Sequence, residues 1–568
     1  METTFGRRDF LKGASVLGAA ALGASMLGGC APKMAGADQG ESLAVTGGGI
    51  DPASVDWDYE ADVVVVGSGS AAMCAAIETA AAGSEALVFE KGTLIGGDSA
   101  LCGGVILAAG WSTQEELTGY AGDTGEAFAE QMVRWSQGMG DPEIIREACL
   151  RSGETVDWLI SIGRTFDAAD ILPPIWSLGD TEADIVPRSL WLSGEIDNDE
   201  FETGTSINGH YKTLQAHAET FGDLLTVKNR HEVTRLLQND AGEVIGVEVS
   251  DDGKTKYAKA RKAVVLACAS VDNNTEMARE LGLNQQFWGM TMRDAGLDSA
   301  SVGYGATSHD VETNTGDGIR MAREIGAQLR LNQACCMNDN HYIGGIAEYA
   351  TGMVSGSNEY KSWRSEGNIL VNQNGRRFCQ EDAEWGYVVS ECANAVISNG
   401  WQPEDPDAVS VYFIVDADHT YSWLLQGIDV ETSDRVKKAD TIEELAELIN
   451  VPAENLKEEI ETWNRYCETG KDLRFGRRAD MGQIVTPPFY ADPMRPGPMG
   501  SYAGVKANIK AEVIGMDGNP IPRLYAAGAV AGGNYVGSFY PGCGWAILNT
   551  CVWGREAGQN AAALEPWE

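Results

Sequence analysis

The hydrophobic and polar positions after residue 57 first define a strand, a glycine turn, a helix and a second strand. Residues 61–66 read Ala-Asp-Val-Val-Val-Val, an apolar run typical of a buried strand. An alanine-rich stretch follows the turn at Gly67, and a second apolar run ends at the acidic Glu90. This order of elements predicts a dinucleotide-binding α/β fold.

The residue types in the turn suit a phosphate-binding role. Gly67 allows a tight turn, and Gly69 lets the backbone approach a pyrophosphate. Ala72 takes the place of the third glycine, where the helix and strand pack closely. The N–H groups and dipole at the helix N-terminus favour an anion. Glu90 can accept hydrogen bonds from both ribose hydroxyls.

A second glycine cluster, residues 91–104, follows directly and exceeds what a simple NAD fingerprint needs. Other segments accompany it in chain order: Ala263–Ala267, Gly316–Gly318, Gly375–Phe378 and Leu524–Gly528. Together they resemble the FAD site of the fumarate reductase and flavocytochrome c superfamily, which includes the 3-ketosteroid dehydrogenases. One segment departs from the family, because Cys268-Ala269-Ser270 stands where Thr-Gly-Gly is usual, and this leaves the local backbone contact to FAD open.

The resemblance implies FAD as cofactor and an α/β fold: a Rossmann-like (GR2-type) FAD-binding domain with an inserted α+β cap domain. The cofactor-binding residues that it implies, together with those of the first turn, are Gly67, Gly69, Ala71, Ala72, Glu90, Lys91, Gly96, Gly97, Asp98, Ser99, Gly103, Gly104, Asp317, Gly528, Ala546 and Ile547.

The chain divides into five parts under this interpretation. They are a twin-arginine signal peptide (1–37), a flexible leader (38–57), the first part of the FAD domain (58–330), the cap (331–490) and the second part of the FAD domain (491–568). Within the cap, the pattern predicts a strand at Val409–Val415 and amphipathic helices near Ile442–Leu456 and Leu456–Tyr466.

The N-terminal residues resemble an export address. Gly6–Lys12 reads GRRDFLK, and a small-residue apolar stretch from Ala14 to Gly29 follows. This resembles a twin-arginine signal and predicts a place in the cell envelope. Cys30 follows a lipoprotein-like sequence, whereas Ala35–Ala37 offers an ordinary cleavage site, so both processing routes and a lipid anchor stay open.

Charge and cysteine usage exclude several classes of partner. The formal net charge of −41 repels phosphate backbones, which excludes nucleic acid as a partner. The 12 cysteines contain no CxxC zinc pattern and no CxxCH haem motif. The histidines show no metal-ligand spacing, so no metal site is predicted, although an iron–sulfur cluster with dispersed ligands stays open.

The C-terminal run distinguishes between substrates. Fumarate reductases place arginines at positions that correspond here to Pro541 and Trp385, and a dicarboxylate needs such cations. Residues 540–544 instead read Tyr-Pro-Gly-Cys-Gly, which is similar to the signature of 3-ketosteroid dehydrogenases. The resemblance implies that Tyr540 and the Gly544 N–H bind a substrate ketone, in the manner of an oxyanion hole. A buried turn aromatic and a packing glycine are the bland alternatives.

The same family uses a tyrosine from the cap to move a proton beside the carbonyl. Tyr387 is the nearest candidate, and Trp385 would pack against a flat apolar substrate. The predicted function is an exported reductase that transfers a hydride from flavin N5 to an activated C=C bond of a small hydrophobic enone or unsaturated lactone, close to the type that reduces cardiac glycosides. A separate cytochrome or quinone-linked protein would supply the electrons. A 3-ketosteroid desaturase and a non-catalytic flavin electron-transfer lipoprotein are the alternatives.

Overall fold

The structure of the chain is a computed structural model. It describes residues 49–102, 104–172, 174–177, 179–191, 209–281, 313–331, 335–338, 367–383, 385–398, 411–419, 436–478, 481–494, 497–537, 539–542 and 544–567. The signal peptide, Cys30 and Gly103 lie outside the described residues. Among the helices that are described, none combines the length and the apolar character needed to cross a bilayer.

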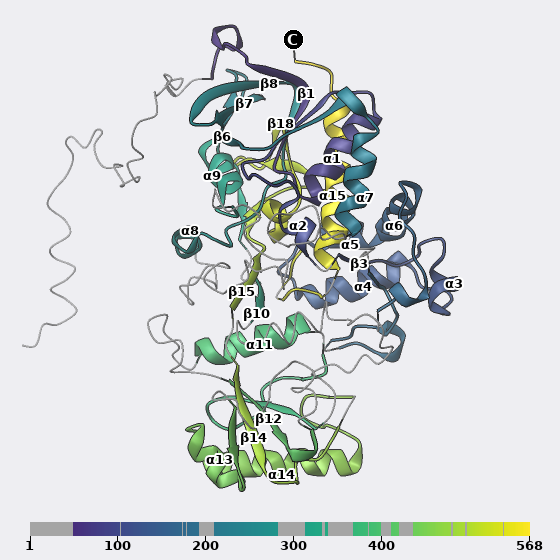
Figure 1. Cartoon of the computed structure of the whole chain (residues 1–568), viewed down its shortest axis with the longest axis vertical. Coiled ribbons are helices and arrows are strands. Elements are labelled where there is room, and N and C mark those ends of the chain that lie inside the picture. The colour runs from purple at the N-terminus through teal and green to yellow at the C-terminus, as the bar shows by residue number, and fades with distance from the viewer. Residues whose placement is uncertain are drawn as a thin grey trace, which may run out of the picture.

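A mixed sheet forms the FAD-binding part of the molecule (Figure 1). Five of its strands run parallel, in the order β18, β8, β1, β2 and β5. Their bounds are Pro520–Ala526, Lys254–Leu266, Tyr59–Val66, Ala86–Phe89 and Leu225–Lys228. The antiparallel strands β17 (Glu512–Ile514), β7 (Val244–Asp251) and β6 (His231–Gln238) complete the sheet.

Strand β1 is apolar on consecutive positions because both faces of the sheet are covered. Val63 and Val65 belong to one hydrophobic cluster, which also contains helices α1 (Ser70–Ala81) and α15 (Trp545–Ala562). Val64 and Val66 belong to the opposite cluster with β6, β7 and α9 (Asp317–Glu324). The predicted buried strand at 61–66 is therefore confirmed.

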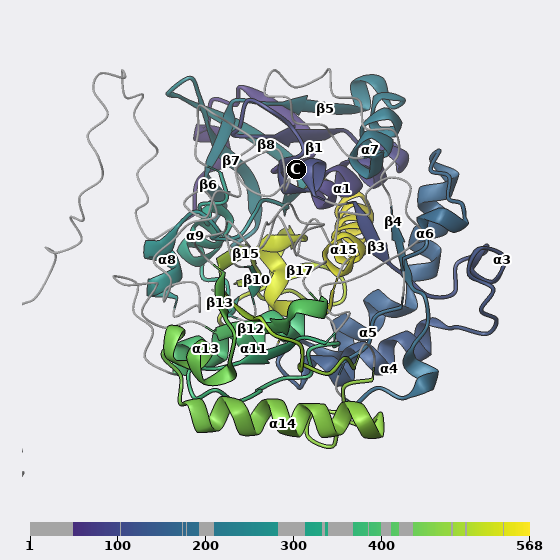
Figure 2. The same cartoon turned by 60° about the horizontal axis from the view of Figure 1, so that its bottom comes forward.

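Helices α1 and α15 lie side by side against one face of this sheet (Figures 1 and 2). Glycines make the close approach possible: a Cβ at Gly554 would lie 2.5 Å from the Ala71 carbonyl oxygen, and one at Gly558 would lie 2.3 Å from the Ala75 carbonyl oxygen. The C-terminal helix thus packs directly on the helix that follows the glycine turn. Helix α7 (Gly209–Glu219) also lies against α1.

Smaller elements flank the FAD-binding part. They are the β3–β4 pair (Val105–Leu107 and Ser189–Trp191), helices α2 (Gly97–Leu101), α3 (Gln114–Thr118), α4 (Gly125–Ser136), α5 (Pro142–Leu150), α6 (Ser152–Ser161) and α8 (Thr275–Glu280), and the 3-10 turns η2 (Pro52–Ser54), η3 (Ala168–Asp170), η4 (Glu182–Asp184), η5 (Gly222–Leu224) and η8 (Ala529–Asn534).

A second, antiparallel sheet lies at the other end of the molecule, in the order β11, β12, β14 and β13. Its bounds are Ile369–Val371, Val411–Asp416, Phe489–Met494 and Lys437–Ala439. One face packs on α13 (Ile442–Leu448) and α14 (Ala453–Thr469), and the other packs toward α11 (Trp385–Ser398). In Figure 1, α11 lies between this sheet and the FAD-binding part. The turn η7 (Ala417–His419) follows β12.

Two short strand pairs join the cap to the FAD-binding part. Strand β9 (Leu329–Arg330) pairs with β16 (Gly504–Val505), and β10 (Cys335–Asn338) pairs with β15 (Gly497–Ser501). The chain therefore leaves and re-enters the FAD-binding part side by side. Strand β14 runs to Met494, four residues past the predicted boundary at 490.

Two expectations from the sequence are wrong in detail. The predicted helices meet at Leu456, but the break lies at 449–452, where Asn450 has φ 54° and Pro452 caps α14. Proline cannot donate within a helix, so a new helix starts there. The end of the predicted flexible leader is also ordered, because the Ile50 N–H donates to the Gln238 carbonyl at 2.7 Å and Val55 is buried.

Candidate active site

The glycine turn after β1 has the geometry that the sequence predicts for it. Gly67 has φ 98°, and a Cβ there would lie 2.7 Å from the Ala267 carbonyl oxygen. Only glycine fits a position with both properties. Gly69 is the N-cap of α1, whose first turn carries no acidic side chain. The positive end of the α1 dipole is therefore not neutralised by a carboxylate of its own first turn.

Glu90 lies at the end of β2 and is bonded within the turn. Its Oε2 accepts from Ser68 Oγ at 2.7 Å, and its Oε1 accepts from the Gly92 N–H at 2.7 Å. Ser68 Oγ in turn accepts from the Gly96 N–H at 2.9 Å. The carboxylate thus links the first glycine turn to the second glycine cluster, and its role toward a ribose stays a prediction.

The second cluster lies across the N-terminus of α1. Ser99 Oγ accepts from the Ser70 N–H at 3.0 Å, and Asp98 accepts from Asn314 at 2.8 Å. Gly96 and Gly97 have φ values of 113° and 50°. A Cβ at Gly97 would meet nothing within 4 Å, so the chain there borders open space. Gly104 also has a positive φ, of 66°.

Lys91 connects this cluster to the start of α9. Its Nζ lies 2.7 Å from Asp317 Oδ2 and 2.7 Å from Thr315 Oγ1. Both partners of the ion pair are largely shielded from solvent. The structure therefore brings Lys91 and Asp317, which are far apart in the sequence, to one side of the predicted cofactor site.

These residues fit an FAD molecule. Its diphosphate needs N–H donors and close backbone approach, which the α1 N-terminus and Gly69 offer, since the nearest atom to a Cβ at Gly69 is Ser99 Oγ at 3.3 Å. Its ribose hydroxyls need a carboxylate at the end of the second strand, which Glu90 offers. The glycine turn, Glu90, the second glycine cluster and the Lys91–Asp317 pair gather around the carboxyl ends of β1 and β2, where ligands of such sheets bind. Ala546 and Ile547 lie apart from them, in the first turn of α15.

The segment that departs from the family is held by main-chain contacts. The Val530 N–H donates to the Cys268 carbonyl at 3.2 Å, and Ser270 Oγ donates to the Ala503 carbonyl at 2.6 Å. Burial, with a contribution from Asp317, raises the pKa of the Cys268 thiol to about 12, so this thiol is neutral. Gly528 packs on α1, where its Cβ would lie 3.0 Å from the Ala71 Cβ.

Tyr540 lies at the N-terminus of α15. Its phenol oxygen accepts from the Ala546 N–H at 3.1 Å, and only 7% of the residue is exposed. Between Tyr540 and α15 the chain passes through Gly542 and Gly544, which have φ values of 117° and 102°. Ile547, in the same turn, is buried, and Ala546 is half-buried.

Gly544 also has a packing role. A Cβ there would lie 2.5 Å from the Leu107 nitrogen, and its carbonyl accepts from the Leu107 N–H at 3.2 Å. Contact with β3 is therefore enough to require glycine, and the role of its N–H toward a substrate ketone stays a prediction.

The cap brings Tyr387 to the same region. Tyr387 is buried on α11 and meets Phe539 edge to face, with ring centroids 5.6 Å apart. Burial and the nearby Cys379 and Glu391 raise the pKa of Tyr387 well above its usual value, so its phenol keeps its proton at neutral pH. Phe539 directly precedes Tyr540 in the chain. Tyr387 therefore contacts the residue next to the other candidate tyrosine. Of Trp385 only the backbone is described.

Two aromatic residues of this region, Tyr502 and Trp135, were not predicted from the sequence. Tyr502 stacks on Tyr540 with ring centroids 5.3 Å apart and an interplanar angle of 22°. Phe539 also contacts Trp135, at 6.0 Å between centroids. No motif marks Tyr502 or Trp135, because they come from separate segments and meet Tyr540 and Phe539 only in the folded chain.

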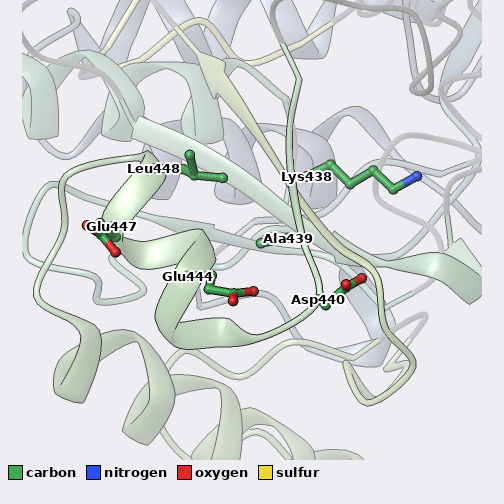
Figure 3. Close-up of a pocket in the computed structure, with 6 residues that line it drawn as sticks. All are labelled: Lys438, Ala439, Asp440, Glu444, Glu447 and Leu448. Carbon is green, nitrogen blue, oxygen red and sulfur yellow. The ribbon is translucent and has the colours of Figure 1, made fainter.

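The described surface also has a hollow that is separate from this site. It lies between β13 and α13 and is lined by Lys438, Ala439, Asp440, Glu444, Glu447 and Leu448 (Figure 3). None of the predicted site residues lines it. Within the described ranges, no group of three or more His, Cys, Asp or Glu side chains could hold a metal ion.

Comparison with known proteins confirms the class of this fold and site. The model of the FAD binding domain family matches residues 62–547, so the chain belongs to this family of flavoproteins. It is an FAD-dependent oxidoreductase, and the predicted fold class, cofactor and resemblance are confirmed.

Among particular relatives, the chain is 53% identical to digoxin reductase from Eggerthella lenta over 571 residues, which cover 100% of this chain and 99% of that one. It is 28% identical to urocanate reductase from the same species, over 89% of this chain and 75% of that one.

The 3-ketosteroid-Δ4-(5α)-dehydrogenase of Rhodococcus jostii RHA1, solved with 4-androstene-3,17-dione, superposes with a TM-score of 0.68 at 25% identity, over 91% of this chain and 99% of that one.

Proposed function

We propose that this FAD-dependent oxidoreductase, which acts on carbon–carbon double bonds, reduces an enone or an unsaturated lactone carried on a steroid-like or other polycyclic or aromatic molecule. When bound, FAD supplies a hydride from N5 of its ring to the β-carbon of that substrate. The residues of the chain bind the substrate, polarise its carbonyl and deliver a proton.

The position of Tyr540 is the observation that carries this proposal. Its oxygen accepts the Ala546 N–H at the positive end of α15. Accepting such a bond makes a phenol a better hydrogen-bond donor, because electron density moves away from its own O–H. Tyr540 is thus suited to stabilise the oxygen of a substrate carbonyl as negative charge develops there, with the Gly544 N–H as second donor.

Tyr387 is suited to the proton transfer. It is held with its proton on by burial, and it reaches the region of Tyr540 from the cap. In the proposed reaction its proton goes to the carbon beside the carbonyl, so the double bond becomes saturated. Proton delivery and carbonyl binding are then divided between the two parts of the chain.

We propose a neutral and flat substrate because aromatic rings accompany the two tyrosines and no arginine stands at position 541. Pro541 occupies the place of a family arginine. The ring of Tyr502 stacks on Tyr540, Phe539 contacts Tyr387, and Trp135 contacts Phe539. Aromatic side chains bind flat apolar ligands through area and stacking. A relative that is 53% identical over the whole chain is named digoxin reductase, and this name supports a lactone or related substrate.

The proposal includes export by the twin-arginine route, a place in the cell envelope and attachment through a lipid on Cys30, supported by Gly6–Lys12 and the apolar stretch after it. An exported enzyme has no pool of NADH outside the membrane. A cytochrome or a quinone-linked protein is therefore the proposed electron donor.

The second candidate is a 3-ketosteroid desaturase, favoured by the similarity to the Rhodococcus enzyme. The two directions are separated by running both on one preparation. Reduction of enones and unsaturated lactones is measured with a low-potential artificial donor, and desaturation of the saturated ketones with an artificial acceptor. We expect reduction to be the faster, and faster desaturation of a steroid ketone would overturn the assigned direction.

A further inference from the structure

A buried histidine lies behind the N-terminus of α1. His210 is the second residue of α7 and is completely buried. Its Nε2 lies 2.9 Å from Ser70 Oγ, and Ser70 is the first residue of α1. A histidine so placed is in contact with the helix turn that receives the cofactor diphosphate, although it lies far from that turn in the sequence.

The imidazole has few other polar neighbours. Cys551 Sγ, on α15, lies 4.0 Å from Nε2, and Nδ1 is buried without a hydrogen-bond partner among the described residues. A buried N–H without an acceptor is costlier than a bare lone pair. The favoured tautomer therefore carries its proton on Nε2 and donates it to Ser70 Oγ.

The next residue of α7 holds the same turn from another point. Tyr211 donates its hydroxyl to the Ser68 carbonyl at 2.6 Å, and its ring would be 3.0 Å from a Cβ at Gly96. His210 and Tyr211 thus fasten Ser70 and Ser68, the two residues on either side of Gly69. Helix α7 therefore contacts the glycine turn through two consecutive side chains.

We propose that His210 is a positioning residue for FAD, which fixes Ser70 through its Nε2 and so holds the first N–H groups of α1 in the orientation that the diphosphate requires. A bound anion gains from helix N–H groups only when they converge on it. A hydrogen bond from a fully buried donor removes the freedom of that first turn before FAD arrives, which lowers the cost of binding. The proposal concerns cofactor binding and does not depend on the substrate.

The test measures FAD retention by the full-length holoprotein. Wild type and variants are diluted in series, and released flavin is measured by its fluorescence to give Kd. We expect His210→Leu to raise the Kd for FAD on the order of 10-fold, because it leaves the Ser70 hydroxyl without its buried donor. His210→Gln, whose amide can still donate to Ser70, should restore most of the affinity.

Ser70→Ala is the partner variant and makes the smallest change of shape. If His210 acts through Ser70, the double variant His210→Leu/Ser70→Ala binds FAD no more weakly than His210→Leu alone. His217→Leu, on the same helix but packed edge to face on Phe221, serves as control and should leave the Kd unchanged. At saturating FAD, kcat of the His217→Leu control should match wild type.

A wild-type Kd for Ser70→Ala would overturn the proposal even if His210→Leu fails to fold. So would additive losses in the double variant, or a Gln variant as weak as the Leu variant. A fall in kcat at saturating FAD with unchanged Kd would place His210 in another role. The Kd is read from flavin fluorescence without any substrate. Its result is therefore distinguishable from a failure of the proposed enone or lactone to be reduced.

Discussion

The two glycine segments that we expect to hold FAD, residues 67–69 and 91–104, are called the cradle. The cradle and the aromatic region around Tyr540 are built in different ways. The cradle consists mainly of main-chain turns, with Gly67, Gly96 and Gly97 at positive φ values that side chains disfavour. The aromatic region consists of side chains, and its rings come from α11, from residue 502 and from residues 539–540. The first is determined by local backbone geometry, and the second only by tertiary packing.

The difference explains why the first region suits many enzymes, and it supports the proposal that the second selects the substrate. A diphosphate presents the same oxygens in every FAD enzyme, so a fixed arrangement of N–H groups serves all of them. A substrate carbonyl differs from one enzyme to the next, and exchange of single side chains such as the residue at 541 changes what is bound. Variants in the two regions should therefore separate FAD retention from turnover.

The largest expected effect on stability lies in the cap that carries Tyr387. Arg377 is fully buried, with its Nε 2.7 Å from Glu381 Oε1 and its Nη2 2.9 Å from Asp472 Oδ2. Arg377→Met removes the nearer cation from two buried carboxylates and leaves Arg477, whose Nη1 lies 3.9 Å from Glu381 Oε2, so it should cost about 3–5 kcal/mol in unfolding free energy. Urea unfolding measures this.

Arg376→Met is the matched control from the same motif. Its partner Glu458 is 65% exposed, and the buried Glu459, 3.8 Å away, keeps its closer partner Arg474, so the loss should be far smaller than for Arg377→Met. Equal losses for the two variants would contradict the assigned role of the buried network.

Tyr540→Phe should have the largest effect on turnover. It keeps the ring and the bound FAD but removes the proposed oxyanion donor, which typically costs on the order of 100-fold in kcat. Steady-state rates and the flavin absorbance of the purified variant measure the two effects separately.

Tyr535→Phe offers a control of the same chemistry. Tyr535 is buried, and its hydroxyl has no hydrogen-bond partner within the described part of the chain. Removing it should leave turnover unchanged, and a similar fall in both variants would remove Tyr540 from the mechanism.

Gly67→Ala should affect the cradle and leave the aromatic region intact. The left-handed conformation and the 2.7 Å approach of its Cβ to the Ala267 oxygen should cost about 1–3 kcal/mol and release FAD. Gly83→Ala has a similar φ of 78° but open space around its Cβ, so it should keep its flavin. The flavin content after gel filtration measures both effects. A Gly67→Ala protein that keeps its full flavin absorbance would contradict the assigned role of Gly67.

The smallest expected effect on stability comes from Asp62, in β1. Burial raises the pKa of Asp62, but the hydrogen bond from Arg261 and the Glu85 N–H more than offset this, so the folded-state pKa lies below the ordinary value. The stability that Asp62 contributes is therefore complete above about pH 4 and is lost as the pH falls through the lower folded-state value.

Asp62→Asn should cost about 1 kcal/mol or less at pH 7. Urea midpoints at pH 7 and pH 3 measure the change, and the difference from wild type should shrink in acid. A difference that is the same at both pH values would contradict this assignment.

Most of the cradle could be predicted from sequence because its residues lie within one segment, 67–104, and its glycines are required locally. Gly67, Gly69 and Glu90 lie together for the reasons that their spacing indicates. His210 and Tyr211 could not be predicted, since nothing in α7 marks them as neighbours of the turn. Tyr502 was missed for the same reason, because it meets Tyr540 only after the chain has returned from the cap.

The ends of helices were the weaker part of the prediction. The pattern of apolar residues continues through 449–452, whereas the backbone breaks there because Asn450 adopts a left-handed conformation before Pro452. Periodicity reports which side is buried, and it does not report where hydrogen bonding stops.

The most direct test of the account is anaerobic reoxidation of the reduced flavoprotein in a stopped-flow instrument. A steroid bearing an unsaturated lactone and fumarate are mixed separately with the reduced protein, and the return of the oxidised flavin absorbance is followed. A neutral, phenol-lined site predicts rapid reoxidation by the lactone and none by fumarate. Rapid reoxidation by fumarate, with no response to the lactone, would contradict it.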